Sequence, residues 1–205
     1  SIFKRCLEDS DPQVREKAIL GLWEYDDRSI VAPLMNLLKS DPAEHVRASA
    51  AVALGKFSIM AETGKLLPKD GDRIRDLLLS VVDNQQESIE VRRRSLESAA
   101  CYNTPRIREL IRWAYNSKDA KLRLSSVYAM GRTCDPSWLT TLVAETKSAD
   151  SAMRYEAANA FAEIGEEEAV PYIVPLLQDE DNQVQLAIVR ALGTIGGPLA
   201  ERALR

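Results

Sequence analysis

The side chains that could carry chemistry are few, and their spacing does not gather them into one site. The single histidine, His45, is flanked by Glu44 and Val46. A metal site needs several converging ligands, which one histidine among scattered carboxylates does not supply. The glycine-rich stretch "GTIGGP" follows an expected helix rather than a strand, so it indicates a helix end and not a phosphate-binding loop. We therefore predict no catalytic residue, no metal ion and no cofactor.

The cysteines give no catalytic signal either. Cys6, Cys101 and Cys134 lie far apart and form no CxxC pair. An odd number of such cysteines predicts reduced thiols, as in the cytosol. Cys101 and Cys134 stand near expected helix ends, where we predict buried packing residues rather than reactive groups. Because the apolar runs are also too short to cross a bilayer, we expect a cytoplasmic protein.

Composition narrows the class of protein. The 205 residues are 45% hydrophobic and 28% charged, which is typical of a folded protein. The net charge of −4 argues against general affinity for nucleic acid or for anionic membranes.

One pattern recurs along the whole chain. An apolar residue precedes an arginine, and small residues follow, as in "KLRLSSVYAMGR" at 121–132. The second position of this motif falls at residues 15, 47, 92, 123, 154 and 185, at intervals of 32, 45, 31, 31 and 31. A fixed period in the low thirties predicts a stacked-repeat architecture.

Each repeat reads as a pair of helices joined by a polar turn. The first helices are expected over 29–40, 73–83, 105–117, 136–148 and 169–179, and the second helix of each pair carries the motif. Aspartates of the turn, such as Asp119 and Asp150, can accept hydrogen bonds from the free amides of the second helix. Glycines at four positions are expected to end these second helices: Gly55, Gly131, Gly165 and Gly193.

Residues three and six positions after the motif arginine are mostly small and lie on one helix face. They would let neighbouring helices approach closely. The arginine itself can cover apolar surface with its stem and meet a carboxylate of an adjacent turn. We predict this structural role for Arg15, Arg47, Arg92, Arg123 and Arg154.

The stretches "DPQVREKAILGL", "EHVRASAAVALG" and "NQVQLAIVRALG" resemble the HEAT repeat, and are closest to the short phycobilisome-lyase-type HEAT-like repeats. The resemblance implies an all-α fold, a right-handed α-solenoid (superhelix) of about six antiparallel helix-pair repeats of ~31 residues. It also implies that the motif helices line a concave face. The chain departs from the pattern at Gln185, which replaces the arginine, and at Trp23, which replaces a glycine.

The whole chain, 1–205, is expected to form a single HEAT-like repeat domain. Because both termini fall inside the repeat register, we expect either an excerpt of a longer array or ends that pack against something. About 14 extra residues in the 45-residue interval are assigned to 57–72, an insertion between helices. It can serve binding or merely extend the neighbouring helices and loop.

A partner would meet the exposed strip of the motif helices. Residues 92–132 contain ten Lys or Arg and three Asp or Glu, which predicts an acidic partner. Alternatively, Arg106, Arg108 and Arg112 lie on another helix and no single patch exists. The residues predicted to bind a partner are Arg93, Glu97, Lys121, Leu124, Tyr128, Arg132, Tyr155 and Asn159.

These observations favour a non-enzymatic scaffold that binds a protein or peptide on the concave face. The alternative is a nucleic-acid module of the HEAT-like DNA glycosylase type that uses the basic band at 92–132, although the acidic flanks argue against it. A phycobilin lyase subunit follows only from the repeat subclass. No His-Glu pair is present, which excludes the di-iron chemistry of HEAT-like deoxyhypusine hydroxylases.

Overall fold

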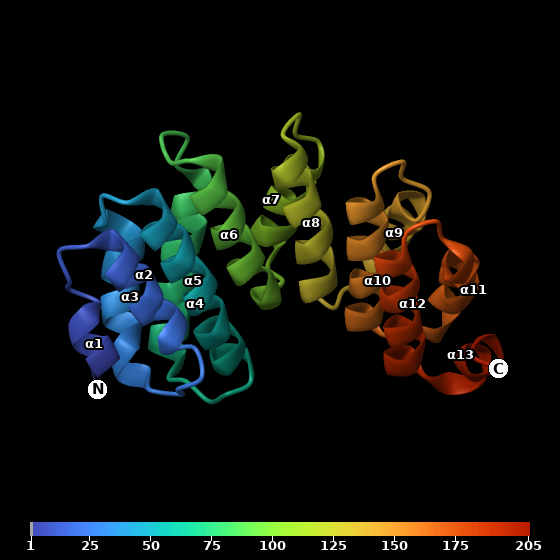
Figure 1. The fold of residues 1–205 in the computed structure, drawn as a ribbon, viewed down its shortest axis with the longest axis horizontal. Helices are drawn as coiled ribbons and strands as arrows, with labels where there is room; N and C mark the ends of the chain where they lie inside the picture. Colours follow the sequence, from blue (N-terminus) through green and yellow to red (C-terminus); the bar gives the residue numbers. More distant parts are fainter. Residues whose placement is uncertain (1) are drawn as a thin grey trace. The chain divides into compact units, whose positions relative to one another are not determined.

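The structure, a computed structural model, describes residues 2–205, which form helices joined by short turns with no strand among them. The chain divides into two compact units, Ser1–Leu110 and Ile111–Arg205, here the N-terminal and C-terminal units. The boundary falls inside helix α7 (Figure 1). Across residues 2–205, no helix is both long and apolar enough to cross a membrane.

Two kinds of helix alternate along the described chain. The helices that carry the repeated motif, here called the motif helices, are α2 (Pro12–Gly21), α4 (Glu44–Glu62), α6 (Ile89–Ala99), α8 (Ala120–Arg132), α10 (Ser151–Ile164) and α12 (Asn182–Ile195). The others, here called the flanking helices, are α1 (Ile2–Cys6), α3 (Val31–Ser40), α5 (Pro68–Asp83), α7 (Pro105–Tyr115), α9 (Leu139–Glu145), α11 (Val170–Ile173) and α13 (Gly197–Ala203).

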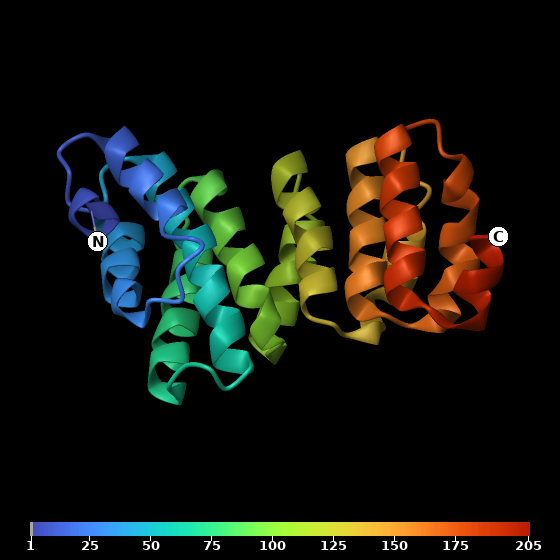
Figure 2. The ribbon, with the colours of Figure 1, turned by 60° about the horizontal axis from the view of Figure 1, so that its bottom comes forward.

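Motif helices pack on motif helices within each unit. In the N-terminal unit α4 lies between α2 and α6, and in the C-terminal unit α10 lies between α8 and α12. Figure 2 shows the row formed by α10 and α12, with the flanking helices of their unit beside it. This arrangement confirms the predicted all-α architecture of stacked helix pairs.

The repeat residues form the core, as predicted. The apolar residue before the motif arginine is fully buried at Val46, Val91 and Val184, and only partly buried at Val14. Small residues three and six positions after the motif arginine are also buried, among them Ser126, Ala157 and Ala160. Small side chains at these positions allow the close helix contacts that fill the interior.

The predicted aspartate caps are present. The Asp119 carboxylate accepts a hydrogen bond from the backbone N–H of Leu122 at 2.9 Å, and Asp150 accepts one from Ala152 at 2.9 Å. Each bond satisfies an amide that has no partner inside the helix. An aspartate of the turn between the paired helices therefore caps the first turn of the motif helix.

The prediction that glycines end the motif helices holds at one position only. Gly165 follows α10 in the left-handed conformation, with φ of 76°. Gly55, Gly131 and Gly193 instead lie inside α4, α8 and α12, so the prediction is wrong there. Packing explains one of them, since a Cβ on Gly131 would lie 2.6 Å from the Cα of Ala160 on α10.

Most motif arginines join one helix pair to the next. The Arg47 guanidinium forms two hydrogen bonds with the Glu87 carboxylate, of 2.9 and 2.8 Å, and also donates to the Asp41 carbonyl at 2.8 Å. Arg92 instead donates to the Val82 carbonyl of α5, the flanking helix of its own pair, at 2.9 Å. Arg123 departs from the prediction because its side chain is exposed.

The residues assigned to the 57–72 insertion lie in the last turns of α4, a short loop and the start of α5. Phe57, Ser58 and Leu66 are buried and pack onto the N-terminal unit, whereas residues 62–65 and 67–69 are exposed. A binding role for the segment stays a prediction.

Candidate functional site

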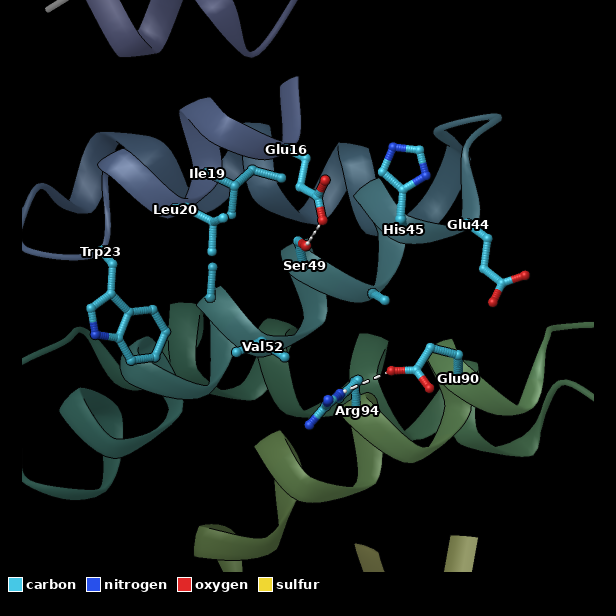
Figure 3. A pocket seen from close by; sticks show the side chains of 12 residues that line it. Glu16, Ile19, Leu20, Trp23, Glu44, His45, Ser49, Val52, Glu90 and Arg94 are labelled. Carbon is cyan, nitrogen blue, oxygen red and sulfur yellow. Dashed lines mark hydrogen bonds and ion pairs between the residues drawn. The ribbon is translucent and has the colours of Figure 1, made fainter. Parts of the chain in front are cut away.

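A groove of about 380 Å³ runs across the three motif helices of the N-terminal unit, and we call it the N-terminal groove (Figure 3). It has an apolar half and a polar half. The apolar half is formed by Ile19, Leu20, Trp23, Val52 and Ala53, and the polar half by Glu16, Glu44, His45, Ser49, Glu90 and Arg94, with Ala48 also in the lining.

The apolar half exposes large side chains that the core does not use. Leu20 is 53% exposed, Trp23 is 43% exposed and Val52 is 36% exposed. Ala48 is 8% exposed, and its small side chain leaves the space between the larger ones open. An apolar surface that remains accessible next to polar residues is typical of a binding site.

The position of Trp23 is fixed from the neighbouring motif helix. The Lys56 ammonium donates to the Trp23 carbonyl at 2.6 Å and forms an ion pair with Asp26 at 2.8 Å. The hydrogen bond and charge of Lys56 lower the pKa of the Asp26 carboxyl. The Asp26 carboxylate therefore balances the charge of Lys56 beside the apolar half of the groove.

Carboxylates dominate the polar half. Glu16 accepts a hydrogen bond from the Ser49 hydroxyl at 3.3 Å, and Glu44 is exposed in the first turn of α4. Glu90 accepts from the Arg94 guanidinium at 3.1 Å. Three carboxylates and one guanidinium line the groove, so its lining carries net negative charge.

The guanidinium in this half is already neutralised. Arg94 forms ion pairs with Glu90 at 3.1 Å and Glu97 at 3.0 Å, and Arg93 forms ion pairs with the same two residues. Burial alone raises the pKa of the Glu90 carboxyl, but hydrogen bonds from Arg93 and Arg94 outweigh it and the pKa lies below its usual value. Glu90 is therefore ionised at neutral pH.

The residues predicted to bind a partner are divided between the two units. Arg93 and Glu97 lie on α6 in the N-terminal unit and pair with each other at 3.3 Å. The other predicted residues lie in the C-terminal unit, on two motif helices that pack together: Lys121, Leu124, Tyr128 and Arg132 on α8, and Tyr155 and Asn159 on α10.

On these two helices, which form what we call the α8–α10 face, exposure varies. Lys121 and Tyr128 are exposed, whereas Leu124, Tyr155 and Asn159 are partly buried. The Arg132 guanidinium forms an ion pair with Glu163 of α10 at 2.7 Å. The α8–α10 face thus offers one exposed aromatic ring and one exposed ammonium group to a partner.

The basic band at 92–132 is largely paired with local groups. Arg106 forms ion pairs with Asp83 at 2.7 Å and Glu109 at 3.1 Å, and Arg108 donates to the Asn103 carbonyl. The Arg112 guanidinium lies 5.2 Å from the centre of the Trp138 ring. All three arginines lie on the flanking helix α7, as the alternative interpretation predicted.

The N-terminal groove contains none of the residues that the sequence predicts to bind a partner. Leu20, His45 and Val52 lie on motif helices, as the predicted residues do, but outside the basic segment at 92–132. Trp23 follows the end of α2, eight positions after Arg15. The available signal was its departure from the repeat pattern, because a large aromatic residue stands where the repeat has glycine.

Comparisons with known proteins agree with this architecture. The sequence profile described as HEAT repeats matches residues 1–81 and 139–205, more than half of the chain. E. coli YibA has a similar structure, with a TM-score of 0.62 and 22% identity over 93% of this chain and 68% of YibA. No curated protein matches the sequence.

Two further solved structures are similar. A designed armadillo repeat protein in complex with the peptide (KR)4 has a TM-score of 0.52 and 18% identity, over 95% of this chain and 98% of that one. Kap121p has a TM-score of 0.62 and 12% identity, over 94% of this chain and 22% of that one. At such identities the likeness shows the fold alone.

Proposed function

Because the chain belongs to the family of HEAT repeats, we propose that it is a non-enzymatic scaffold that binds a protein or peptide on the exposed strips of its motif helices. The observation that carries this proposal is the N-terminal groove. Three consecutive motif helices build it, and Leu20, Trp23 and Val52 remain exposed in it.

The composition of the groove supports binding rather than catalysis. Tryptophan and arginine are favoured at binding hot spots because they offer large contact areas and directional donors. In the polar half, Glu16 accepts a hydrogen bond from Ser49 and Glu90 is paired with Arg93 and Arg94, so these two carboxylates form part of a charged surface. The α8–α10 face contributes Tyr128 as a second exposed aromatic ring.

Relatives of this fold support a peptide as one kind of partner. The designed armadillo repeat protein is in complex with a peptide of lysine and arginine. We carry over only that stacked helix pairs can hold a peptide along their surface. The pairing of the basic band with local groups leaves nucleic-acid binding without a supporting observation.

Selection from a random peptide library displayed on phage, with the full chain immobilised, tests the scaffold function. We expect enriched peptides whose binding is lost in Leu20→Asp, or in Tyr128→Ala and Arg132→Glu, while circular dichroism shows an unchanged helix content. The matched control is Leu67→Asp, because Leu67 is 64% exposed but lies outside the groove, in the turn before α5.

Two results would contradict the proposal. One is a library that yields no enriched sequence. The other is a set of enriched peptides that bind all the motif-helix variants as tightly as the unaltered chain.

A further inference from the structure

We propose that the N-terminal groove selects a partner segment in which a large apolar side chain is followed or preceded by Lys or Arg. This inference rests on the proposed scaffold function and adds the chemistry of the partner. It replaces the acidic partner that the charge of residues 92–132 predicted.

The apolar half defines the first requirement. Leu20 and Trp23 come from α2 and its end, and Val52 comes from α4, so two neighbouring motif helices form this half. Ala48 leaves the space between them open. A Leu, Phe or Trp side chain placed there would bury its own surface together with that of Trp23, the residue type most often found at the centre of hot spots.

The polar half defines the second requirement. Glu16 and Glu44 face the groove from α2 and α4, next to His45, and Glu90 faces it from α6 (Figure 3). Electrostatic complementarity favours a partner of the opposite charge and disfavours an acidic one. A lysine ammonium or an arginine guanidinium fits this half, whereas a carboxylate would meet like charges.

The cations near the groove do not neutralise the negative charge of its polar half. Arg94 is shared between Glu90 and Glu97, and Lys56 is matched by Asp26. Glu16, by contrast, is held only by a neutral hydroxyl at 3.3 Å among the bonds described. Glu44 acts on the charge of Arg47, but Arg47 is paired with Glu87 at 2.8 Å. The carboxylates of α2 and α4 are therefore the ones available to a cation of the partner.

Helix geometry sets the spacing of the two requirements. Glu16 and Leu20 are one turn apart on α2, which is about 6 Å along the axis, and Glu44 and Val52 on α4 are separated by about 12 Å. An extended chain advances about 3.3 Å per residue. The apolar and basic residues of the partner should accordingly be about two to four positions apart.

Synthetic peptides labelled with fluorescein test this chemistry by fluorescence anisotropy with the full chain. Each peptide carries one Trp or Leu and, three positions away, Lys, Gln or Glu on an otherwise identical background. We expect the Lys peptide to bind about tenfold more tightly than the Glu peptide. Its affinity should fall as salt is raised, whereas that of the Gln peptide should change little.

Variants locate the effect in the groove. Glu16→Gln with Glu44→Gln should weaken the Lys peptide by about three- to tenfold and leave the Gln peptide unchanged. Trp23→Ala should weaken both peptides by at least about tenfold. The control, Glu62→Gln with Glu201→Gln, removes two exposed carboxylates outside the groove and should change neither.

The outcomes separate the two proposals. If library-selected peptides are acidic or uncharged and lose binding in Leu20→Asp, the scaffold function stands and the basic partner is wrong. If selected peptides depend on Tyr128 and ignore Trp23, the scaffold function stands and the groove is not its site. If no peptide of any charge binds, both proposals are overturned.

Discussion

The carboxylate of Asp41 accepts two hydrogen bonds from the guanidinium of Arg15, with Nε–Oδ2 of 2.7 Å and Nη2–Oδ1 of 2.8 Å. Arg15 lies on the first motif helix and Asp41 follows the flanking helix of the next pair. Arg154 and Asp179 repeat the same geometry, with bonds of 2.7 and 2.8 Å. Both arginines also donate to a carbonyl six residues earlier in the chain, at 2.8 Å.

Arg154→Ala should lower the free energy of unfolding by about 3 kcal/mol, because it leaves the buried Asp179 carboxylate without its partner. Arg123→Ala is the matched control, since Arg123 holds the same motif position but is exposed, and it should change stability by less than about 0.5 kcal/mol. Urea unfolding measures both. Equal losses in the two variants would show that the ion pair contributes nothing specific.

Acidification should destabilise the protein through these carboxylates. The hydrogen bonds from Arg154 hold the pKa of Asp179 below its usual value. An aspartate in the unfolded chain titrates near pH 3.9, so the stabilisation is complete well above that pH and is lost as the pH falls through the lower folded value. Urea midpoints between pH 7 and pH 3 should fall in the unaltered protein, and should fall less in Asp179→Asn. A steeper loss in Asp179→Asn would contradict the assignment.

Gly131→Ala should destabilise the C-terminal unit by about 1–3 kcal/mol, because the added Cβ would lie 2.6 Å from the Cα of Ala160. Gly193 occupies the corresponding position of α12, where an added Cβ would meet no atom within 4 Å. Gly193→Ala should therefore stabilise by about 0.5–1 kcal/mol through helix propensity. Thermal unfolding compares the two, and a shift of the same sign in both would refute the packing argument.

Cys134 should react first with iodoacetamide under native conditions. Its side chain is exposed in the turn after α8, where φ is 51°, whereas Cys6 and Cys101 are partly buried. The expectation that Cys134 is a buried packing residue is therefore wrong, since the residue is exposed in a turn outside the helix. Peptide mapping by mass spectrometry after brief alkylation measures the order, and the unfolded protein should show no such preference.

The repeat period was sufficient to predict the helix pairs, because a recurring spacing reports a shared core that each residue helps to form. The same pattern also predicted the buried small residues, such as Ser126 and Ala157, and the ion pairs of Arg15 and Arg154 with a carboxylate of an adjacent turn. The helix ends predicted at Gly55, Gly131 and Gly193 were wrong, because these three glycines lie inside helices. Close packing accounts for Gly131 but not for Gly193.

The charge of a candidate binding surface is harder to predict, because it depends on which charged side chains pair with each other after folding. Arg93, Arg94 and Arg106 looked like a positive patch in the sequence, yet each lies beside carboxylates in the structure. Linear charge counts do not reveal such pairs when a partner such as Asp83 is 23 residues away. The position of the exposed Trp23 could not be predicted either, because it depends on the hydrogen bond that Lys56 of α4 donates to the Trp23 carbonyl.

Three ion pairs of the motif arginines each join a helix pair only to its immediate neighbour: Arg15–Asp41, Arg47–Glu87 and Arg154–Asp179. Cooperativity in such a row is nearest-neighbour in range. Loss of one of these ion pairs should therefore loosen the adjoining helix pair before it affects distant ones. Faster amide hydrogen exchange should then spread outward from the altered ion pair, one repeat at a time.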